Sequence, residues 1–409
     1  MESLSQRFPL MAQKIMSHVD DKTLINFKET GRNNAYFLGK ERFYWIRIIQ
    51  RYNCLIGELQ EVWKKVVTKT PIDIIKELAV AIHQFPRTIF REHKNEILPS
   101  EPTSPIEFVQ KIEKQWHPLF IGATCGSVNL CDHIIKKVGV KNSTIFKRSG
   151  KITPLVFAAE FMNNLNVFKL LLEKAEDKNP ILITDVNWTL LHNLAEKGHL
   201  EMVTIMVKQI QNKSPLDVHG STPYHIAAYF GHVELCYLLM KYNMDKNPKN
   251  YGGQTPLLFA AYNGQLEICR LLLEMCVDKN HADDALRKPL HIAAFYGHVE
   301  VVELFMANVR DKNLRDNEGW KTPLLSAIEG GNLNVCILLV EKYKADVNMS
   351  DNYGMTPLHL ASKLGQLEIC QFLSRYVHDK NIVDHNGKTP IDLAISEQKW
   401  EIVFSDLFW

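Results

Sequence analysis

The sequence predicts an all-α solenoid in which short helix pairs stack on one another, preceded by a small helical module. Three observations predict this fold: a block that recurs every 33 to 36 residues, a Thr-Pro pair at the start of most blocks, and a glycine midway through most of them. The clearest copies read TPYHIAAYFGHV, PLHIAAFYGHV and TPLHLASKLGQL. The anchor position falls at Pro118, Pro154, Leu190, Pro223, Pro256, Pro289, Pro323, Pro357 and Pro390.

Each part of the block has a physical role in a pair of helices. Threonine offers an oxygen to the unpaired N–H groups of a helix start, and proline at the next position gives up no hydrogen bond. A glycine such as Gly231 suits the left-handed residue that ends the first helix. The apolar run that follows predicts a second helix with one buried face. Helices this short are marginal alone, so each pair is expected to be stable only on its neighbours.

These residues resemble the ankyrin repeat, in which each unit is a turn followed by two short helices. The resemblance covers residues 115–409 and implies nine repeats with short β-turn fingers, the terminal ones degenerate. It also implies a protein-binding role, with no catalysis by this chain. Three repeats depart from the pattern: Leu190 replaces proline in the third, Met162 is inserted in the second, and the sixth has Lys288 for threonine and no glycine in its turn, 283–287.

Composition limits the class of partner and the compartment. The net charge is only +2, and no basic tract indicates nucleic acid. The sequence shows no leader and no apolar run long enough for a membrane span, so we expect a cytoplasmic protein, with the nucleus left open. Five cysteines share one position of the second helix, where stacked helices lie too far apart for disulfides. These reduced core residues are Cys131, Cys236, Cys269, Cys336 and Cys370.

Motifs of catalysis, phosphate binding and zinc binding are absent from the sequence. The histidines recur at equivalent places in successive repeats, roughly 10 Å apart, whereas zinc needs its nitrogen ligands at about 2 Å. We therefore expect structural histidines, no metal, no cofactor and no catalytic residue. The histidines concerned are His192, His225, His291 and His359 in the helix starts, and His199, His232 and His298 after the glycines.

Residues 1–52 are a different module, with three short helical patterns. A proline near the start, an isoleucine and a leucine at set spacing, and a Trp-x-Arg resemble the F-box. The family often has Cys-Arg-x-Trp where this chain has Gly-Arg-Asn-Asn at 31–34, and leucine where it has Phe8. The resemblance implies binding to the adaptor subunit of SCF-type cullin–RING ubiquitin ligases. The implied contact residues are Phe8, Pro9, Ile15, Leu24, Phe27 and Trp45.

A helical connector with a Pro-rich linker near 98–105 is expected over residues 53–114. The combined interpretation is an adaptor that recruits a target through its repeats and tethers it to the ligase. The alternative is a scaffold with no ubiquitin link, whose N-terminal helices cap the solenoid. A microbial or viral effector that mimics host F-box proteins fits the same residues.

A run of aromatic residues predicts where the partner binds. The two positions before the helix-ending glycine carry Tyr229-Phe230, Tyr262 and Phe295-Tyr296 in three successive repeats. Aromatic rings are favoured anchors at the centres of interfaces. The alternative is that the rings pack on the neighbouring repeat and only part of each is exposed. The predicted groove comprises Trp188, Tyr229, Phe230, Tyr262, Phe295, Tyr296 and Trp320, with the two tryptophans in the fingers.

Overall fold

The structure, a computed structural model, describes most of the chain from residue 118 to residue 405. The described residues are 118–124, 126–139, 145–147, 150–159, 164–182, 184–242, 245–275, 280–284, 286–309, 311–316 and 320–405. The predicted modules at 1–52 and 53–114 lie outside them, as does the predicted insertion at Met162. The chain divides into two compact units, Met1–Asp185 and Val186–Trp409.

In the first unit the described residues form two helix pairs and one antiparallel hairpin. The hairpin, in which Ile145 lies opposite Ile152, adds two strands that the all-α prediction did not include. β-Branched and aromatic residues at Ile145, Phe146 and Ile152 favour strands over a longer finger loop. The elements are α9 (Pro118–Thr124), α10 (Val128–Val138), β1 (Ile145–Lys147), β2 (Gly150–Ile152), α11 (Pro154–Phe157) and α12 (Leu165–Lys174).

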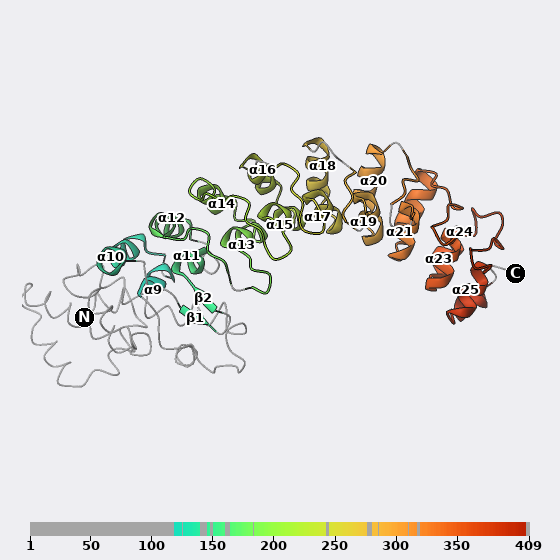
Figure 1. The fold of residues 1–409 in the computed structure, drawn as a ribbon, viewed down its shortest axis with the longest axis horizontal. Helices are drawn as coiled ribbons and strands as arrows, with labels where there is room; N and C mark the ends of the chain where they lie inside the picture. Colours follow the sequence, from blue (N-terminus) through green and yellow to red (C-terminus); the bar gives the residue numbers. More distant parts are fainter. Residues whose placement is uncertain are drawn as a thin grey trace, which may run out of the picture. The chain divides into compact units, whose positions relative to one another are not determined.

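The second unit contains seven helix pairs among its described residues. The first helix of each pair, here called inner, lies in one row, and the second, called outer, lies in another (Figure 1). The pairs are α13 (Leu190–Glu196) with α14 (Leu200–Met206), α15 (Pro223–Phe230) with α16 (Val233–Tyr242), α17 (Pro256–Tyr262) with α18 (Leu266–Met275), α19 (Pro289–Tyr296) with α20 (Val299–Asn308), α21 (Pro323–Glu329) with α22 (Leu333–Ile337), α23 (Pro357–Leu364) with α24 (Leu367–Leu373), and α25 (Pro390–Ser396) with α26 (Trp400–Val403). A π-helical turn, Leu338–Lys342, continues α22.

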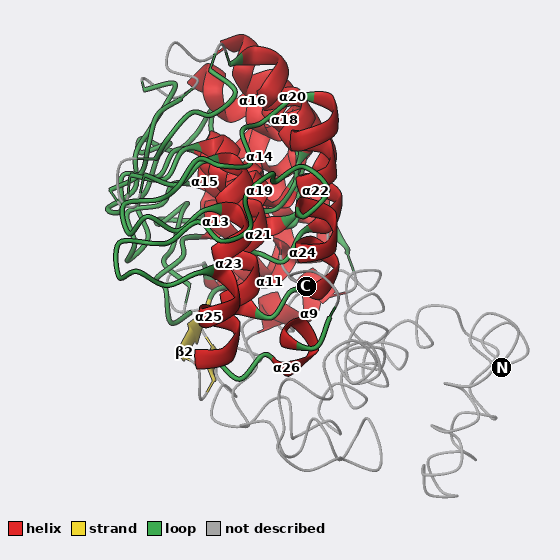
Figure 2. Ribbon diagram, turned by 90° about the vertical axis from the view of Figure 1, so that its right-hand side faces the viewer, coloured by secondary structure: helices red, strands yellow, loops and turns green. Residues whose placement is uncertain are grey.

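The loops that lead from one outer helix to the next inner helix are the fingers. They gather on the side of the inner helices, away from the outer row (Figure 2). Fingers also bond to one another, because the N–H of Tyr251 donates to the carbonyl oxygen of His219, and that of His385 to Tyr353. The predicted architecture of an α-solenoid with turn fingers is therefore confirmed for this unit.

Every inner helix of the second unit begins at the predicted anchor residue, including Leu190, which stands in place of proline. Threonine precedes the anchor in six of the seven, and its oxygen caps the helix start in all of these except α17, where Thr255 makes no such bond. In three of these six helices the third residue is a histidine, and the backbone N–H of the threonine donates to its Nδ1. The pairs are Thr189 with His192, Thr222 with His225 and Thr356 with His359, at 3.1 to 3.3 Å.

The same histidines join each repeat to the next one. Because Nδ1 accepts a hydrogen bond from threonine, the proton of the neutral ring is on Nε2. His192 Nε2 donates to the carbonyl oxygen of Ser221 at 3.0 Å, and His225 Nε2 to Gln254 at 3.0 Å. His359 makes the equivalent bond to Lys388 at 3.1 Å. One neutral imidazole therefore caps a helix and holds the following finger.

The finger before α19 departs from the pattern, as the sequence indicated. The residue three positions before each anchor has a positive φ, and this residue is glycine in four fingers but Leu286 here, at 62°. Lys288 replaces the capping threonine, which leaves the buried Nδ1 of His291 without a hydrogen-bond partner. In compensation, Arg287 pairs with the buried carboxylate of Asp283 at 2.8 Å. Arginine thus stabilises a turn whose backbone is strained.

The core lies between the rows, where apolar side chains of both helices are buried. Alanine pairs such as Ala227 with Ala228 are fully buried and allow close approach of neighbouring helices. All five cysteines that the sequence placed in the second helices are buried and reduced. Burial raises the pKa of the Cys269 thiol to about 12, so it stays protonated at neutral pH.

Two features are absent from the described residues, a membrane-spanning helix and a metal-binding cluster. None of their helices has the length and apolar character needed to cross a bilayer. Within the same residues, no cluster of histidine, cysteine, aspartate and glutamate side chains could hold a metal ion.

The neutral histidines predict that acid destabilises the fold. Burial lowers the pKa of His225 to about 4, and it also lowers the pKa values of His192, His291 and His359. Each folded-state pKa is below the unfolded value near 6.5, so the unfolded chain takes up protons first as the pH falls. Stability is therefore full above about pH 6.5 and declines below it, by roughly 1.4 kcal/mol per pH unit for each histidine.

Urea denaturation at pH 7.5, 6.0 and 5.0 measures this loss. This pH range stays above the one in which most carboxylates titrate. The variant His225→Gln is expected to show a shallower decline than the wild type. An unfolding free energy that is constant or rises from pH 7.5 to 5.0 would show that these rings are not held neutral.

Candidate functional site

Five aromatic side chains on α15, α17 and α19 form one continuous row, here called the aromatic ladder. Its members are Phe230, Tyr229, Tyr262, Tyr296 and Phe295. The ring centroids of Tyr229 and Tyr262 are 5.9 Å apart, and those of Tyr262 and Tyr296 are 4.2 Å apart. Phe230 meets Tyr229 edge to face at 5.1 Å, and Phe295 meets Tyr296 in the same way at 5.0 Å. The structure thus brings together five of the seven residues predicted for the groove.

The ladder side chains are neither buried in the core nor fully exposed to solvent. The exposed fractions are 39% for Phe230, 42% for Tyr262, 36% for Phe295 and 40% for Tyr296, while Tyr229 is half-buried. The rings therefore pack across repeats, as one interpretation expects, and still present part of their area to solvent. A contiguous exposed aromatic surface is typical of an interaction site.

The backbone beneath the ladder is held by side chains of the following repeat. Gln265 Nε2 donates to the carbonyl oxygen of Tyr229 at 3.1 Å, and Asn263 Nδ2 to the same oxygen at 2.9 Å. His298 Nε2 donates to the carbonyl oxygen of Tyr262 at 2.9 Å, and Asn332 Nδ2 to that of Phe295 at 2.6 Å. The residues that carry the rings thus have their orphan helix-end carbonyls satisfied. The ladder is therefore pre-organised.

Tyr296 of the ladder keeps its phenol proton at physiological pH. Burial, and then a hydrogen bond with Tyr262, raise the pKa of Tyr296 to about 12. Its hydroxyl therefore keeps its proton and can act both as donor and as acceptor. The ladder offers flat apolar area with polar groups along one edge, which suits recognition of a peptide more than chemistry.

The two tryptophans lie in fingers on either side of the ladder. Trp188, before α13, is half-buried; its Nε1 donates to Asp217 Oδ2 at 3.3 Å, and its ring stacks on His192. Trp320, before α21, is 57% exposed and has a positive φ of 56°, with the Arg315 guanidinium 5.2 Å from its ring centroid. Trp188 is thus tied to Asp217 of the following finger and to His192 of α13, whereas Trp320 presents its indole to solvent.

The sequence did not predict two further residues beside the ladder, Phe259 and Arg287. Phe259 lies on α17 and its ring contacts both His225, at 5.1 Å, and Tyr229, at 6.3 Å. Arg287 faces Tyr296, and its charge acts to lower the pKa of that phenol. Phe259 could have been found from its place one turn before Tyr262. Arg287 could have been found because it stands in a finger that lacks the turn glycine of four other fingers.

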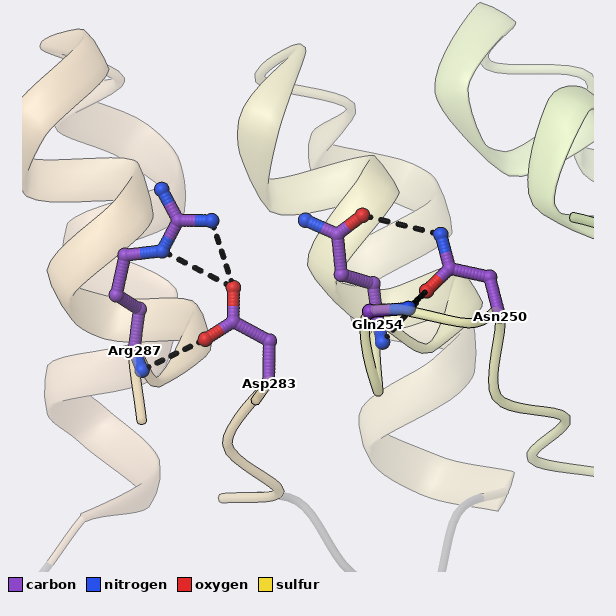
Figure 3. A network of polar contacts seen from close by, with 5 residues as sticks. Asn250, Gln254, Asp283 and Arg287 are labelled. Carbon is purple, nitrogen blue, oxygen red and sulfur yellow. Dashed lines mark hydrogen bonds and ion pairs between the residues drawn. The ribbon is translucent and has the colours of Figure 1, made fainter. Parts of the chain in front are cut away.

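A polar network supports the fingers before α17 and α19 (Figure 3). In the first, Asn250 Oδ1 accepts from the backbone N–H of Gln254 at 2.9 Å, and Asn250 Nδ2 donates to the side-chain oxygen of Gln254 at 3.1 Å. In the second, Asp283 Oδ1 accepts from the N–H of Arg287 at 2.8 Å, and Oδ2 accepts from the guanidinium. One buried polar side chain thus closes each turn and orients the residue two positions before the anchor.

A family model described as ankyrin repeats matches three stretches, residues 178–250, 245–316 and 290–384. Together they span half of the chain. The chain belongs to the ankyrin-repeat family. No curated protein matches it. Ankyrin-repeat proteins are generally non-enzymatic interaction scaffolds, and a protein-binding role agrees with the pre-organised aromatic surface on α15, α17 and α19.

Proposed function

We propose that this chain is an adaptor that binds a target protein on the aromatic ladder and tethers it to an SCF-type cullin–RING ubiquitin ligase. The observation that carries target binding is the ladder itself. Its rings touch in sequence across three repeats, remain about 40% exposed, and stand on a backbone held by the next repeat. Ligase chemistry would belong to the other subunits.

The tether rests on the sequence pattern in residues 1–52. Phe8, Pro9 and Ile15 begin it, Leu24 and Phe27 follow in a second helical pattern, and Trp45 closes it. This pattern resembles the F-box, which supports binding to the adaptor subunit of the ligase. A scaffold without the ubiquitin link is the competing function, and it shares the ladder but lacks the tether.

Binding of the purified ligase adaptor subunit to the full chain separates these functions. We expect binding by titration calorimetry, and we expect the double variant Pro9→Ala/Ile15→Ala to weaken it at least about tenfold, since each removes apolar contact area. The variant should keep the urea midpoint of the repeats. If the wild-type chain shows no binding at tens of micromolar, the tether is wrong and the scaffold function replaces it.

The ladder is tested with peptides selected from a random phage-displayed library on the full chain. The variant Tyr229→Ala/Phe295→Ala should weaken the selected peptides by about 1–4 kcal/mol, roughly 5- to 1000-fold, the range for interface hot spots. Its melting temperature should change little, because rings this exposed contribute less to folding than core side chains do.

The matched control is Tyr237→Ala/Phe404→Ala, which removes two rings that are 57% and 79% exposed away from the ladder. It should leave peptide affinity unchanged. A large fall in melting temperature with unchanged affinity in Tyr229→Ala/Phe295→Ala would show that the ladder is packing between repeats and not a binding site.

A further inference from the structure

Two rows of side chains run along the surface between the inner helices and the fingers, here called the groove. One row stands two residues before each anchor, and the other six residues after it. Lys321 Nζ and Glu329 Oε2 are 2.7 Å apart, so the two positions face each other within a repeat. The first row is Trp188, Ser221, Gln254, Arg287, Lys321, Met355 and Lys388; the second is Glu196, Tyr229, Tyr262, Phe295, Glu329, Lys363 and Ser396.

The charge of these rows is uneven. From α19 to α25 they carry four cations and one carboxylate, Glu329, which is already paired with Lys321. From α13 to α17 the only charge is Glu196. The cations are Arg287, Lys321, Lys363 and Lys388, and all four are exposed or half-buried.

The aspartates at the bases of the same fingers neutralise this charge only at Arg287, which pairs with Asp283 at 2.8 Å. Asp283, Asp316, Asp351 and Asp384 are each 6% exposed or less. Their Oδ1 atoms accept backbone N–H groups of their own turns, as Asp384 does from Lys388 at 2.9 Å. The solvent-facing groups of the two rows on this side of the groove are therefore mainly cationic.

We propose that the groove binds an extended segment of a partner protein that has apolar or aromatic side chains over the ladder and acidic side chains over α19 to α25. The proposal rests on the function of the ladder proposed above and names the chemistry of its ligand. Neighbouring helices are about 8–10 Å apart, and an extended chain advances about 3.3 Å per residue, so each repeat faces about three residues. The apolar part therefore spans roughly six to nine residues, with the acidic part next to it.

Charge placement favours a peptide over a single-stranded nucleic acid. A nucleic acid stacked on aromatic rings also needs cations along the same stretch to neutralise its phosphates. Beside the ladder, however, the first row has the uncharged residues Ser221 and Gln254, and cations begin only at Arg287. Aromatic and cationic zones thus overlap only at α19 and are otherwise consecutive along the groove, which matches a segment whose apolar and acidic residues are also consecutive.

The test uses random 16-residue peptides displayed on phage and selected on the full chain. Enriched sequences should hold a cluster of apolar residues followed or preceded by aspartate and glutamate. Synthetic copies should bind about tenfold more weakly when their acidic residues become amides, and also when sodium chloride rises from 50 to 500 mM. An oligo(U) RNA of 12 nucleotides, tested in the same anisotropy assay, should not bind.

The decisive variant is Lys363→Glu/Lys388→Glu, with Lys208→Glu/Lys241→Glu as the control. Both make the same change in charge, but Lys208 follows α14 and Lys241 is in α16, on the outer row. The first should weaken the peptides at least about tenfold, by loss of attraction and gain of repulsion. The control should change their affinity less than about twofold.

The outcomes separate this inference from the function on which it rests. Some selected peptides could need Tyr229 and Phe295 for binding yet lack acidic residues, or bind Lys363→Glu/Lys388→Glu with unchanged affinity. Either result overturns the inference and leaves the ladder as a binding site. Peptides that bind Tyr229→Ala/Phe295→Ala with unchanged affinity overturn both the inference and the proposed binding function of the ladder. Tight binding of the RNA with no selected peptide would assign the groove to nucleic acid and overturn the peptide proposal.

Discussion

The interface between successive helix pairs is the constraint on which the rest of the second unit depends. Helices of four to ten residues cannot hold their shape alone, and each pair buries its apolar face only against its neighbours. Hydrogen bonds supplement this burial in both directions along the chain. His225 donates forward to the finger of the next repeat, and Gln265 donates backward to the helix end of the previous one.

The same interface positions the candidate site. The backward bonds end on the carbonyl oxygens of Glu196, Tyr229, Tyr262 and Phe295, which are the residues six positions after each anchor. Three of these residues carry ladder rings. The hydrogen bonds that hold successive repeats together therefore also fix the backbone that presents the rings. A surface built in this way loses little conformational entropy when it binds a partner.

Much of the fold of the second unit could be predicted because its signals are local and repeated. Leu190 shows this well, since its helix starts at the periodic position even without proline, through the cap of Thr189 and His192. Other features have no local signal. The positive φ of Leu286 and Trp320 follows from the turn that neighbouring fingers impose, and residue propensity alone argues against it.

The hairpin at Ile145–Ile152 was missed for a similar reason, because three-residue strands have no periodicity to detect. The ladder positions were predictable from their register, but the chain of ring contacts was not, because contact depends on side-chain rotamers. Trp188 shows the limit most clearly. Its finger position was read correctly, yet its bond to Asp217 needs coordinates to be seen.

The most direct test of the central role of the interfaces compares two equivalent side chains. Ile268 and Ile402 both stand twelve residues after their anchors and are 1% and 0% exposed, but the first lies in a central pair and the second in the last described pair. Urea denaturation should show that Ile268→Ala costs about 2–5 kcal/mol, as for a well-packed core. Ile402→Ala should cost distinctly less, because among the described residues its repeat packs on one neighbour only. Equal losses would contradict an array stabilised by nearest-neighbour interfaces.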